Sequence, residues 1–340
     1  MGPVVGVDLG GTKVAAAALS DGVLGDPVLR ATDLTSREAL LDELVALIDE
    51  IRPPDLQGVG VGVPSIVEFE TGRVVSSVNV PLADVPLRHV LSDRLGLPVF
   101  VDNDATVAAL AEALDEDLRP AARNLVMLTF GTGVGGGIVI GGRIYRGSSG
   151  GAGELGHTIV AAEREGEVPV EQTFPQPGSL ESVASGHALD HLAVRSAEEH
   201  PEGALGRLQA AGQPVTGVEV VDAAQAGDAV ARRTIQLWAE RVGIGVANAI
   251  NTFDPDEVVI GGGAARAGEL LLESACRVAR AYIVPGLGTR TKIRLARYGQ
   301  RAGVLGAAML AVHELELSSH DAADNAGPSR PFRTPEVSRP

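Results

Sequence analysis

The chain has 340 residues, of which 45% are hydrophobic, and its formal net charge at pH 7 is −16. This length suits two lobes, and the negative charge argues against a nucleic-acid partner, because binding phosphates requires clustered Lys and Arg. The single cysteine, Cys276, excludes a disulfide framework, and no apolar run reaches the ~20 residues of a membrane span.

The chain opens with an apolar strand, residues 4–9, which runs through paired glycines into a second apolar run at 14–19. Glycines let a backbone turn sharply and approach a bulky anion, because they have no Cβ. Asp8, at the end of the strand, can hold hydrated Mg²⁺ beside the phosphates of a nucleotide. An ordinary hairpin turn explains the same pattern. The candidate phosphate-binding residues of this turn are Gly10, Gly11, Thr12 and Lys13.

Helices and strands alternate after this hairpin. Apolar residues at helical spacing, introduced by Ser36 as N-cap, predict a helix over 36–51. The pattern then predicts a strand at 57–63, a helix near 84–95, a strand at 98–102 and a helix at 104–116. This alternation is typical of an α/β fold.

The same order begins again after residue 118, where we place a lobe boundary. A buried-type strand at 124–130 leads to a glycine turn at 131–137 and a second apolar run at 138–140. Later elements are a helix at 228–251, a strand at 257–263, a further helix and a last helix at 303–315. We expect loops bordering a cleft at 161–175 and 196–217, and a disordered tail at 318–340.

Asn103 and Asp104 lie where a predicted strand ends and a helix begins. An aspartate in this position is commonly only a helix cap. The functional interpretation makes Asp104 a general base, which takes the proton of a substrate hydroxyl as its oxygen attacks a γ-phosphoryl group. Asn103 would hold a neighbouring hydroxyl. Asp102 is expected to face away from this site, because adjacent residues of an extended segment point to opposite sides.

Three further polar side chains suit the hydroxyls of a polyol, which both donate and accept hydrogen bonds. Glu154 and His157 lie three residues apart in the glycine-rich segment 150–157, for which a solvated loop is the alternative. Glu181 lies in the first turn of a predicted helix, where a favourable interaction with the helix dipole also explains it.

The glycine turns at 8–13 and 131–137 can present N–H groups and a Thr hydroxyl to phosphates from two sides. The cluster at 261–263 offers bare backbone to a flat adenine, and none of the three has the ending of a Walker P-loop.

With these motifs in this order, the chain resembles the ROK sugar kinases, a group of bacterial glucokinases, N-acetylhexosamine kinases and fructokinases. The resemblance covers roughly residues 4–315. It implies the two-lobed, actin/hexokinase-like ATPase fold with ribonuclease H-like lobes. One lobe would comprise 1–118, completed by the helix at 303–315, and the other would comprise 119–302.

The resemblance also implies ATP-dependent phosphorylation of the primary hydroxyl of a hexose, with ATP and Mg²⁺ as cofactors. Asp104 would be the catalytic base, and Asp8 would serve Mg²⁺ through water. The implied sugar ligands are Asn79, Asn103, Glu154, His157 and Glu181. The implied nucleotide ligands are Asp8, Gly10, Gly11, Thr12, Thr132, Gly133, Gly262 and Gly263, while Lys13 would offer charge to a phosphate or face solvent.

The chain departs from the family at its zinc motif. The family usually has three cysteines, which bind a structural zinc together with the preceding histidine, where this chain has Gln172, Phe174 and Ser179. An amide, a ring and a hydroxyl cannot replace three thiolates, so we expect no zinc site and a loop that Phe174 stiffens by packing. The substrate therefore stays open between a hexose and an aminosugar or seven-carbon cyclitol, of kanosamine or valiolone type, in antibiotic biosynthesis.

A sugar-responsive regulator or a silent sugar-binding module is the competing class. Repressors of this family carry a helix-turn-helix before the first strand, whereas three residues precede it in this acidic chain. Asp104 and both phosphate turns also favour an enzyme. We expect a small-molecule sugar or cyclitol as partner, no nucleic acid and no membrane. The resemblance implies a homodimer. A cytoplasmic location is expected, because Asp8 and the glycines interrupt the first apolar stretch.

Overall fold

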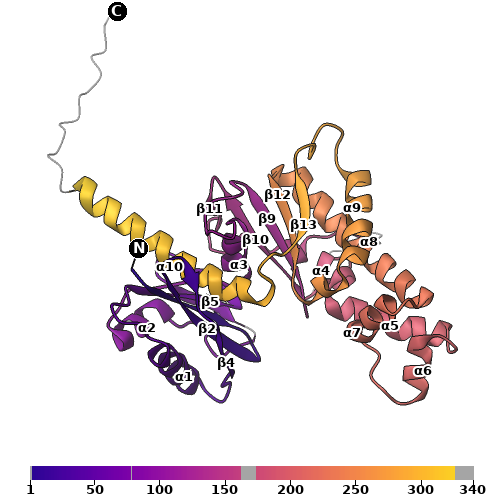
Figure 1. The fold of residues 1–340 in the computed structure, drawn as a ribbon, viewed down its shortest axis with the longest axis horizontal. Helices are drawn as coiled ribbons and strands as arrows, with labels where there is room; N and C mark the ends of the chain where they lie inside the picture. The colour runs from indigo at the N-terminus through magenta and orange to yellow at the C-terminus, as the bar shows by residue number, and fades with distance from the viewer. Residues whose placement is uncertain (1, 78, 162–173, 326–340) are drawn as a thin grey trace, which may run out of the picture.

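Two β-sheets form the body of the protein in the computed structural model, which describes residues 2–77, 79–161 and 174–325 (Figure 1). The first sheet has the order β3-β2-β1-β5-β8, with β4 paired to β2, and the second has the order β11-β10-β9-β12-β13. The predicted α/β class is confirmed. The strands of the first sheet are β1 (Val4–Leu9), β2 (Lys13–Ser20), β3 (Val23–Leu24), β4 (Val28–Ala31), β5 (Gly58–Val63) and β8 (Val99–Asn103).

The first sheet brings two predicted site residues to one edge. Strand β1 forms the predicted antiparallel hairpin with β2, and it pairs in parallel with β5, which pairs in parallel with β8. In this register Asp8 lies opposite Gly62, and Gly62 lies opposite Asp102. Because parallel strands end at the same edge of a sheet, the carboxyl ends of β1 and β8 are close together.

The second sheet repeats this arrangement. Its strands are β9 (Leu125–Phe130), β10 (Val134–Ile140), β11 (Arg143–Ile144), β12 (Glu257–Gly261) and β13 (Lys292–Leu295). Strand β9 pairs with β10 in an antiparallel hairpin and with β12 in parallel, so the glycines after β9 and after β12 are neighbours.

The prediction that residues 131–137 form a turn was wrong at its end, because β10 begins at Val134. The strand contains Gly136 and Gly137 for reasons of packing. A Cβ at Gly136 would lie 2.4 Å from the carbonyl oxygen of Gly153, and one at Gly137 would lie 2.5 Å from that of Ala105. These two glycines therefore occupy a strand because neighbouring backbone approaches it closely.

Most predicted helices are confirmed, with changes at their ends. Helix α1 (Arg37–Glu50) is capped by Ser36, and helix α8 (Ala229–Phe253) follows Asp228 as its N-cap. Helix α2 (Leu87–Leu95) begins later than predicted, because Val85 forms a β-bridge with Val74. Two further strands are β6 (Ser65–Glu68) and β7 (Arg73–Ser77), and three further helical elements are η2 (Gly263–Ala267), α9 (Glu269–Tyr282) and η3 (Gly299–Arg301).

Two other predictions were wrong. Residues 196–217, expected to be loop-rich, contain the end of α5 (Gly186–Glu199), all of α6 (Ala204–Ala210) and the first residue of α7 (Gly217–Gln225). Helix α4 (Leu180–Ala184) precedes them. These helices bury Leu192, Leu205 and Val220 in the second core, which overrides the polar, glycine-rich composition of the segment. The last helix, α10 (Ala302–Asn325), continues past residue 318, where we had placed the start of a disordered tail. Residues 162–173 and 326–340 lie outside the described part.

Helices α3 (Asp104–Glu112) and α10 pack against each other and against the sheets with almost no side chain between them. A Cβ at Gly60 of β5 would lie 1.7 Å from the carbonyl oxygen of Ala307, and one at Gly306 would lie 1.8 Å from that of Val107. Helix α3 also contacts β9 and β10 of the second sheet. The pair thus joins the two sheets.

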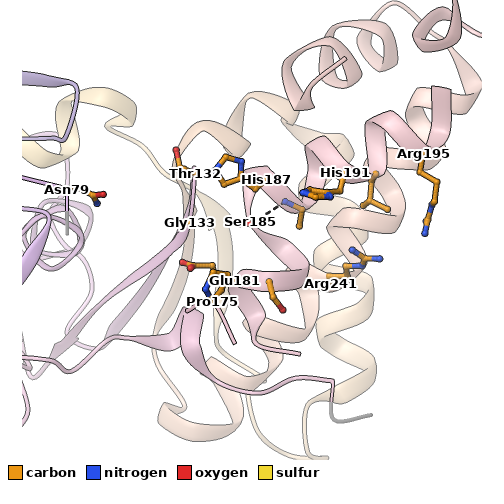
Figure 2. Close-up of a pocket in the computed structure, with 13 residues that line it drawn as sticks. Asn79, Thr132, Gly133, Pro175, Glu181, Ser185, His187, His191, Arg195 and Arg241 are labelled. Atoms are coloured by element: carbon orange, nitrogen blue, oxygen red, sulfur yellow. Dashed lines mark hydrogen bonds between the residues drawn. The ribbon is translucent and has the colours of Figure 1, made fainter. Parts of the chain in front are cut away.

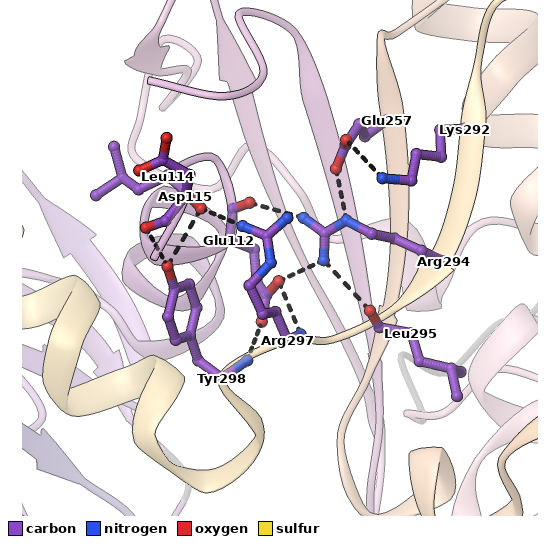
Figure 3. Close-up of polar contacts among 9 residues, drawn as sticks. All are labelled: Glu112, Leu114, Asp115, Glu257, Lys292, Arg294, Leu295, Arg297 and Tyr298. Carbon is purple, nitrogen blue, oxygen red and sulfur yellow. Dashed lines mark hydrogen bonds and ion pairs between the residues drawn. The ribbon is translucent and has the colours of Figure 1, made fainter. Parts of the chain in front are cut away.

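A buried carboxylate, Glu112, fixes the far end of α3, which ends earlier than the predicted residue 116 (Figure 3). It accepts hydrogen bonds from the guanidinium of Arg294 at 2.6 Å and from the backbone N–H groups of Arg297 and Tyr298 at 3.0 and 2.9 Å. Arg294 also pairs with Glu257 of β12 at 2.6 Å. Glu112 therefore joins α3 to the second sheet and to the segment that leads into α10.

We expect Gly306→Ala to lower the free energy of unfolding by about 3 kcal/mol, because the new methyl group must displace the backbone of α3. Urea unfolding of the purified protein measures this change. Gly25→Ala is the matched control: Gly25 is exposed, and its nearest neighbour would lie 3.5 Å from the added Cβ. Equal stabilities of the two variants would contradict the close-packing argument.

Candidate active site

The helix cap at the start of α3 comes from Asn103, not from Asp104. The Oδ1 atom of Asn103 accepts the N–H of Thr106 at 3.0 Å, and its Nδ2 atom donates to the carbonyl of Ser65 at 3.4 Å. Asp104 is the first helical residue, and one of its oxygens accepts the N–H of Ala105 at 2.7 Å. Because Asn103 supplies the cap, capping does not explain why an acid stands at position 104.

Asp104 and Asp8 are two partly buried acids that repel each other. Desolvation, the charge of Asp8 and, to a smaller extent, Glu154 together raise the pKa of Asp104 to about 7. Burial also raises the pKa of Asp8 to about 6, against the opposing effect of Lys13. A carboxylate with a pKa near neutrality suits proton transfer at physiological pH.

Gly303, in the first turn of α10, lies directly against Asp8. A Cβ at this position would lie 2.3 Å from Oδ2 of Asp8. The start of a helix carries partial positive charge, which favours an anion in this place. Sequence reasoning missed Gly303, although two glycines three residues apart in an otherwise apolar last helix were a signal of close packing.

The first glycine turn, residues 10–13, is tight and held from outside. The N–H of Gly10 donates to the carbonyl of Lys13 at 2.9 Å, and the hydroxyl of Thr32 donates to the carbonyl of Gly10 at 2.8 Å. Gly11 faces Asn79, whose Cβ would lie 3.2 Å from a Cβ at Gly11. Lys13 is exposed and reaches Gln300 at 3.4 Å. The turn thus brings Asn79 beside the predicted phosphate-binding residues.

The second glycine turn, residues 131–133, is fixed by α4 and α5. The N–H of Gly131 donates to the carbonyl of Gly133 at 2.9 Å, and the N–H of Gly186 donates to the carbonyl of Gly131 at 2.7 Å. Oε2 of Glu181 accepts the N–H of Val134 at 2.8 Å. Glu181 therefore has a specific role at this turn besides its position at the start of a helix.

Glu154 and His157 flank the short 3-10 helix η1 (Leu155–His157), with Oε2 of Glu154 3.5 Å from Nε2 of His157. The ring of Phe174 lies edge-on to the His157 ring, with centroids 5.2 Å apart. The predicted packing by Phe174 is therefore present. Gln172 lies outside the described residues. Within the described ranges, no group of three or more His, Cys, Asp or Glu could hold a metal ion.

A cavity of about 780 Å³, here called the cleft cavity, brings four predicted residues together (Figure 2). Asn79 and the second glycine turn, through Thr132 and Gly133, line it together with Glu181. Gly262 and Gly263 do not line this cavity. A Cβ at Gly262 would lie 2.5 Å from the carbonyl oxygen of Phe130, so this glycine is needed for packing beside the second turn.

The cleft cavity also has a basic wall that sequence reasoning missed, formed by His187, His191 and Arg195 of α5 and by Arg241 of α8. The first three follow each other at spacings of four residues, which was a readable signal, and Figure 2 shows them in line along α5. Burial and the neighbouring Arg195 lower the pKa of Arg241. Two of these side chains already face acids, since His187 lies 3.5 Å from Asp190 and Arg195 lies 3.7 Å from Glu199.

Comparison with known proteins places the chain among sugar kinases. A glucokinase from Halalkalibacterium halodurans is 36% identical, covering 90% of this chain and 94% of its own length. A ROK family glucokinase from Streptomyces griseus, solved with glucose and AMPPNP, is 32% identical with a TM-score of 0.76, covering 92% of this chain and all of its own. A ROK hexokinase from Thermus thermophilus is 33% identical with a TM-score of 0.70, covering 92% of this chain and 99% of its own.

Two sheets that each end in a glycine turn, with an acid at the start of the helix between them, define an ATPase of the actin/hexokinase-like fold. The ROK family model matches residues 4–314. The chain belongs to the ROK family, as the sequence motifs predicted.

We expect Asp104→Asn to stabilise the protein at pH 8, because the folded state then no longer buries this charge. The pKa of Asp104 is higher in the folded state, about 7, than the ordinary value of 3.8. Its contribution to stability is therefore complete below pH 4 and is lost as the pH rises through 7. The gain at pH 8 is on the order of 3 kcal/mol and shrinks toward pH 5.

Thermal unfolding between pH 5 and pH 8 measures this effect. Asp26→Asn, at an exposed position, is the control and should leave the pH profile unchanged. If the stability of the Asp104→Asn variant changes with pH in the same way as that of the wild type, Asp104 is not buried as an anion.

Proposed function

We propose that the protein is an ATP-dependent kinase that phosphorylates the primary hydroxyl of a hexose, with glucose as the first candidate. The observation that carries this proposal is the partly buried Asp104, with a pKa near 7, beside Asp8 and at the edge where the glycine turns lie. The glucokinase relatives and the structure solved with glucose and AMPPNP support it.

In this mechanism Asp104 accepts the proton of the primary hydroxyl while its oxygen attacks the γ-phosphoryl group. The hydrogen bond that Asp104 accepts from Ala105 fixes one of its oxygens and leaves the other for the substrate. The side chains proposed to hold the other hydroxyls are Asn79, Asn103, Glu154, His157 and Glu181. Of these, Asn103 has one amide proton left, because its oxygen caps α3 and it donates to Ser65.

The donor phosphates would lie between the first glycine turn, through Gly10, Gly11 and Thr12, and the second turn, through Thr132 and Gly133. The carboxylate chemistry of Asp8 fits a hydrated Mg²⁺, which supplies neutralisation of the phosphate charge when bound. Lys13 would add charge at the edge of the first turn. Gly262 and Gly263, next to the second turn, are proposed to face the adenosine.

We propose two lobes, 1–118 with 303–315 and 119–302, because each sheet has its own hydrophobic core. Closure of such lobes would exclude water and limit hydrolysis of ATP. None of the described helices is long and apolar enough to cross a membrane. We further propose a homodimer located in the cytoplasm, for which light scattering of the purified protein and fractionation of cells are the tests.

A coupled assay for ADP release over a panel of acceptors tests the proposed function. We expect release that depends on one acceptor among glucose, mannose, glucosamine, kanosamine and a valiolone-type cyclitol, with the phosphate on the primary hydroxyl by NMR. Asp104→Asn should keep sugar binding and lose 10²–10⁴-fold in turnover. Acceptor-independent release, or near-normal turnover of this variant, would contradict the mechanism.

We also propose that the enzyme works without zinc, because His157 packs on the ring of Phe174. Treatment with a zinc chelator, followed by excess Mg²⁺, should leave the sugar KM within twofold of the untreated enzyme. One equivalent of zinc in the purified protein, together with a raised KM after its removal, would show that a zinc site exists.

A further inference from the structure

The segment 146–157 carries Glu154 and His157 and packs between the two-stranded sheet β6-β7 and the second large sheet. On one side Gly150 abuts β6, where an added Cβ would lie 1.9 Å from the carbonyl oxygen of Val67. On the other side Gly153 abuts β10, where an added Cβ would lie 2.7 Å from the carbonyl oxygen of Gly136. The segment begins at Arg146.

That first residue, Arg146, is held by three groups from the half of the molecule that contains the first sheet. Its Nε atom lies 2.7 Å from Oδ2 of Asp102, and its Nη2 atom lies 3.4 Å from Oε1 of Glu314 on α10. The guanidinium carbon lies 3.4 Å from the centroid of the Phe69 ring, which follows β6. A planar guanidinium can pair with a carboxylate and stack on a ring at once, whereas an ammonium group cannot.

The partner carboxylate connects this contact to the catalytic base. The side chain of Asp102 is 3% exposed. Its Oδ1 atom accepts the N–H of Asn103 at 2.9 Å. One buried carboxylate thus joins Arg146 to the backbone from which α3 and Asp104 begin. The carbonyl of Arg146 accepts the N–H of Ala152 at 3.1 Å, which extends the constraint into the segment.

We propose that Arg146 is a positioning residue, which aligns the sugar-binding segment 146–157 with Asp104 through its pairing with Asp102. The proposal rests on the proposed function, because it assigns the segment to sugar binding. Arg146 does not itself touch the substrate. Its removal should weaken binding of the sugar while leaving the two glycine turns and their ligand unaffected.

The test compares Arg146→Gln with Arg143→Gln, an exposed arginine on the neighbouring strand β11. We expect Arg146→Gln to raise the KM for the sugar at least tenfold and to leave the KM for ATP within threefold. Hydrogen exchange of the amides in 147–157 should become at least tenfold faster. Arg143→Gln should change none of these quantities.

A second variant, Asp102→Asn/Arg146→Gln, controls for misfolding, because Arg146→Gln alone leaves the buried carboxylate of Asp102 unpaired. If Arg146 acts through Asp102, the double variant should raise the sugar KM no further than Arg146→Gln does. An unchanged sugar KM with unchanged exchange in 147–157 would overturn the proposal, as would equal rises in both KM values. If the wild type phosphorylates no sugar, the proposed function fails, while the exchange experiment still decides whether Arg146 holds the segment.

Discussion

Contact between backbones, without intervening side chains, sets the distance between the two halves of this protein. Helix α10 touches β5 at Gly60 and α3 at Gly306, and α3 touches β10 at Gly137. The two acids of the site depend on these contacts, because Asp104 begins α3 and Asp8 lies against the first turn of α10. The opposite end of α3 is held by the buried Glu112. Any side chain at these glycines would separate the acids from each other and from the glycine turns.

Asp8 and Asp104 are electrostatically unfavourable in the folded protein. Two carboxylates are partly buried, an exposed lysine opposes the shift of Asp8 alone, and both acids have raised pKa values. Shifted pKa values are characteristic of functional sites, where reactivity is gained at the expense of stability. The basic wall of α5 and α8 lines the cleft cavity, whereas neither of the two acids does.

Sequence reasoning predicted the strand–glycine–strand hairpins, most helices and the acid at position 104, because these follow from local patterns. It failed where tertiary contacts decide. Gly136 and Gly137 belong to a strand because other backbone packs on them, which no turn propensity reveals. Asn103 rather than Asp104 caps α3, although either residue type could have done so. Helix α6 and its neighbours form because a second core is available to Leu205, despite a polar and glycine-rich sequence.

The contact between His157 and Phe174 has a consequence for how the protein tolerates its surroundings. The aromatic ring of Phe174, and not a cysteine sulfur, lies beside His157. The one cysteine of the whole sequence lies in α9. This contact contains no thiol that peroxide could oxidise. Oxidation of thiols would therefore leave the contact intact, in contrast to a loop that depends on thiolates for its structure.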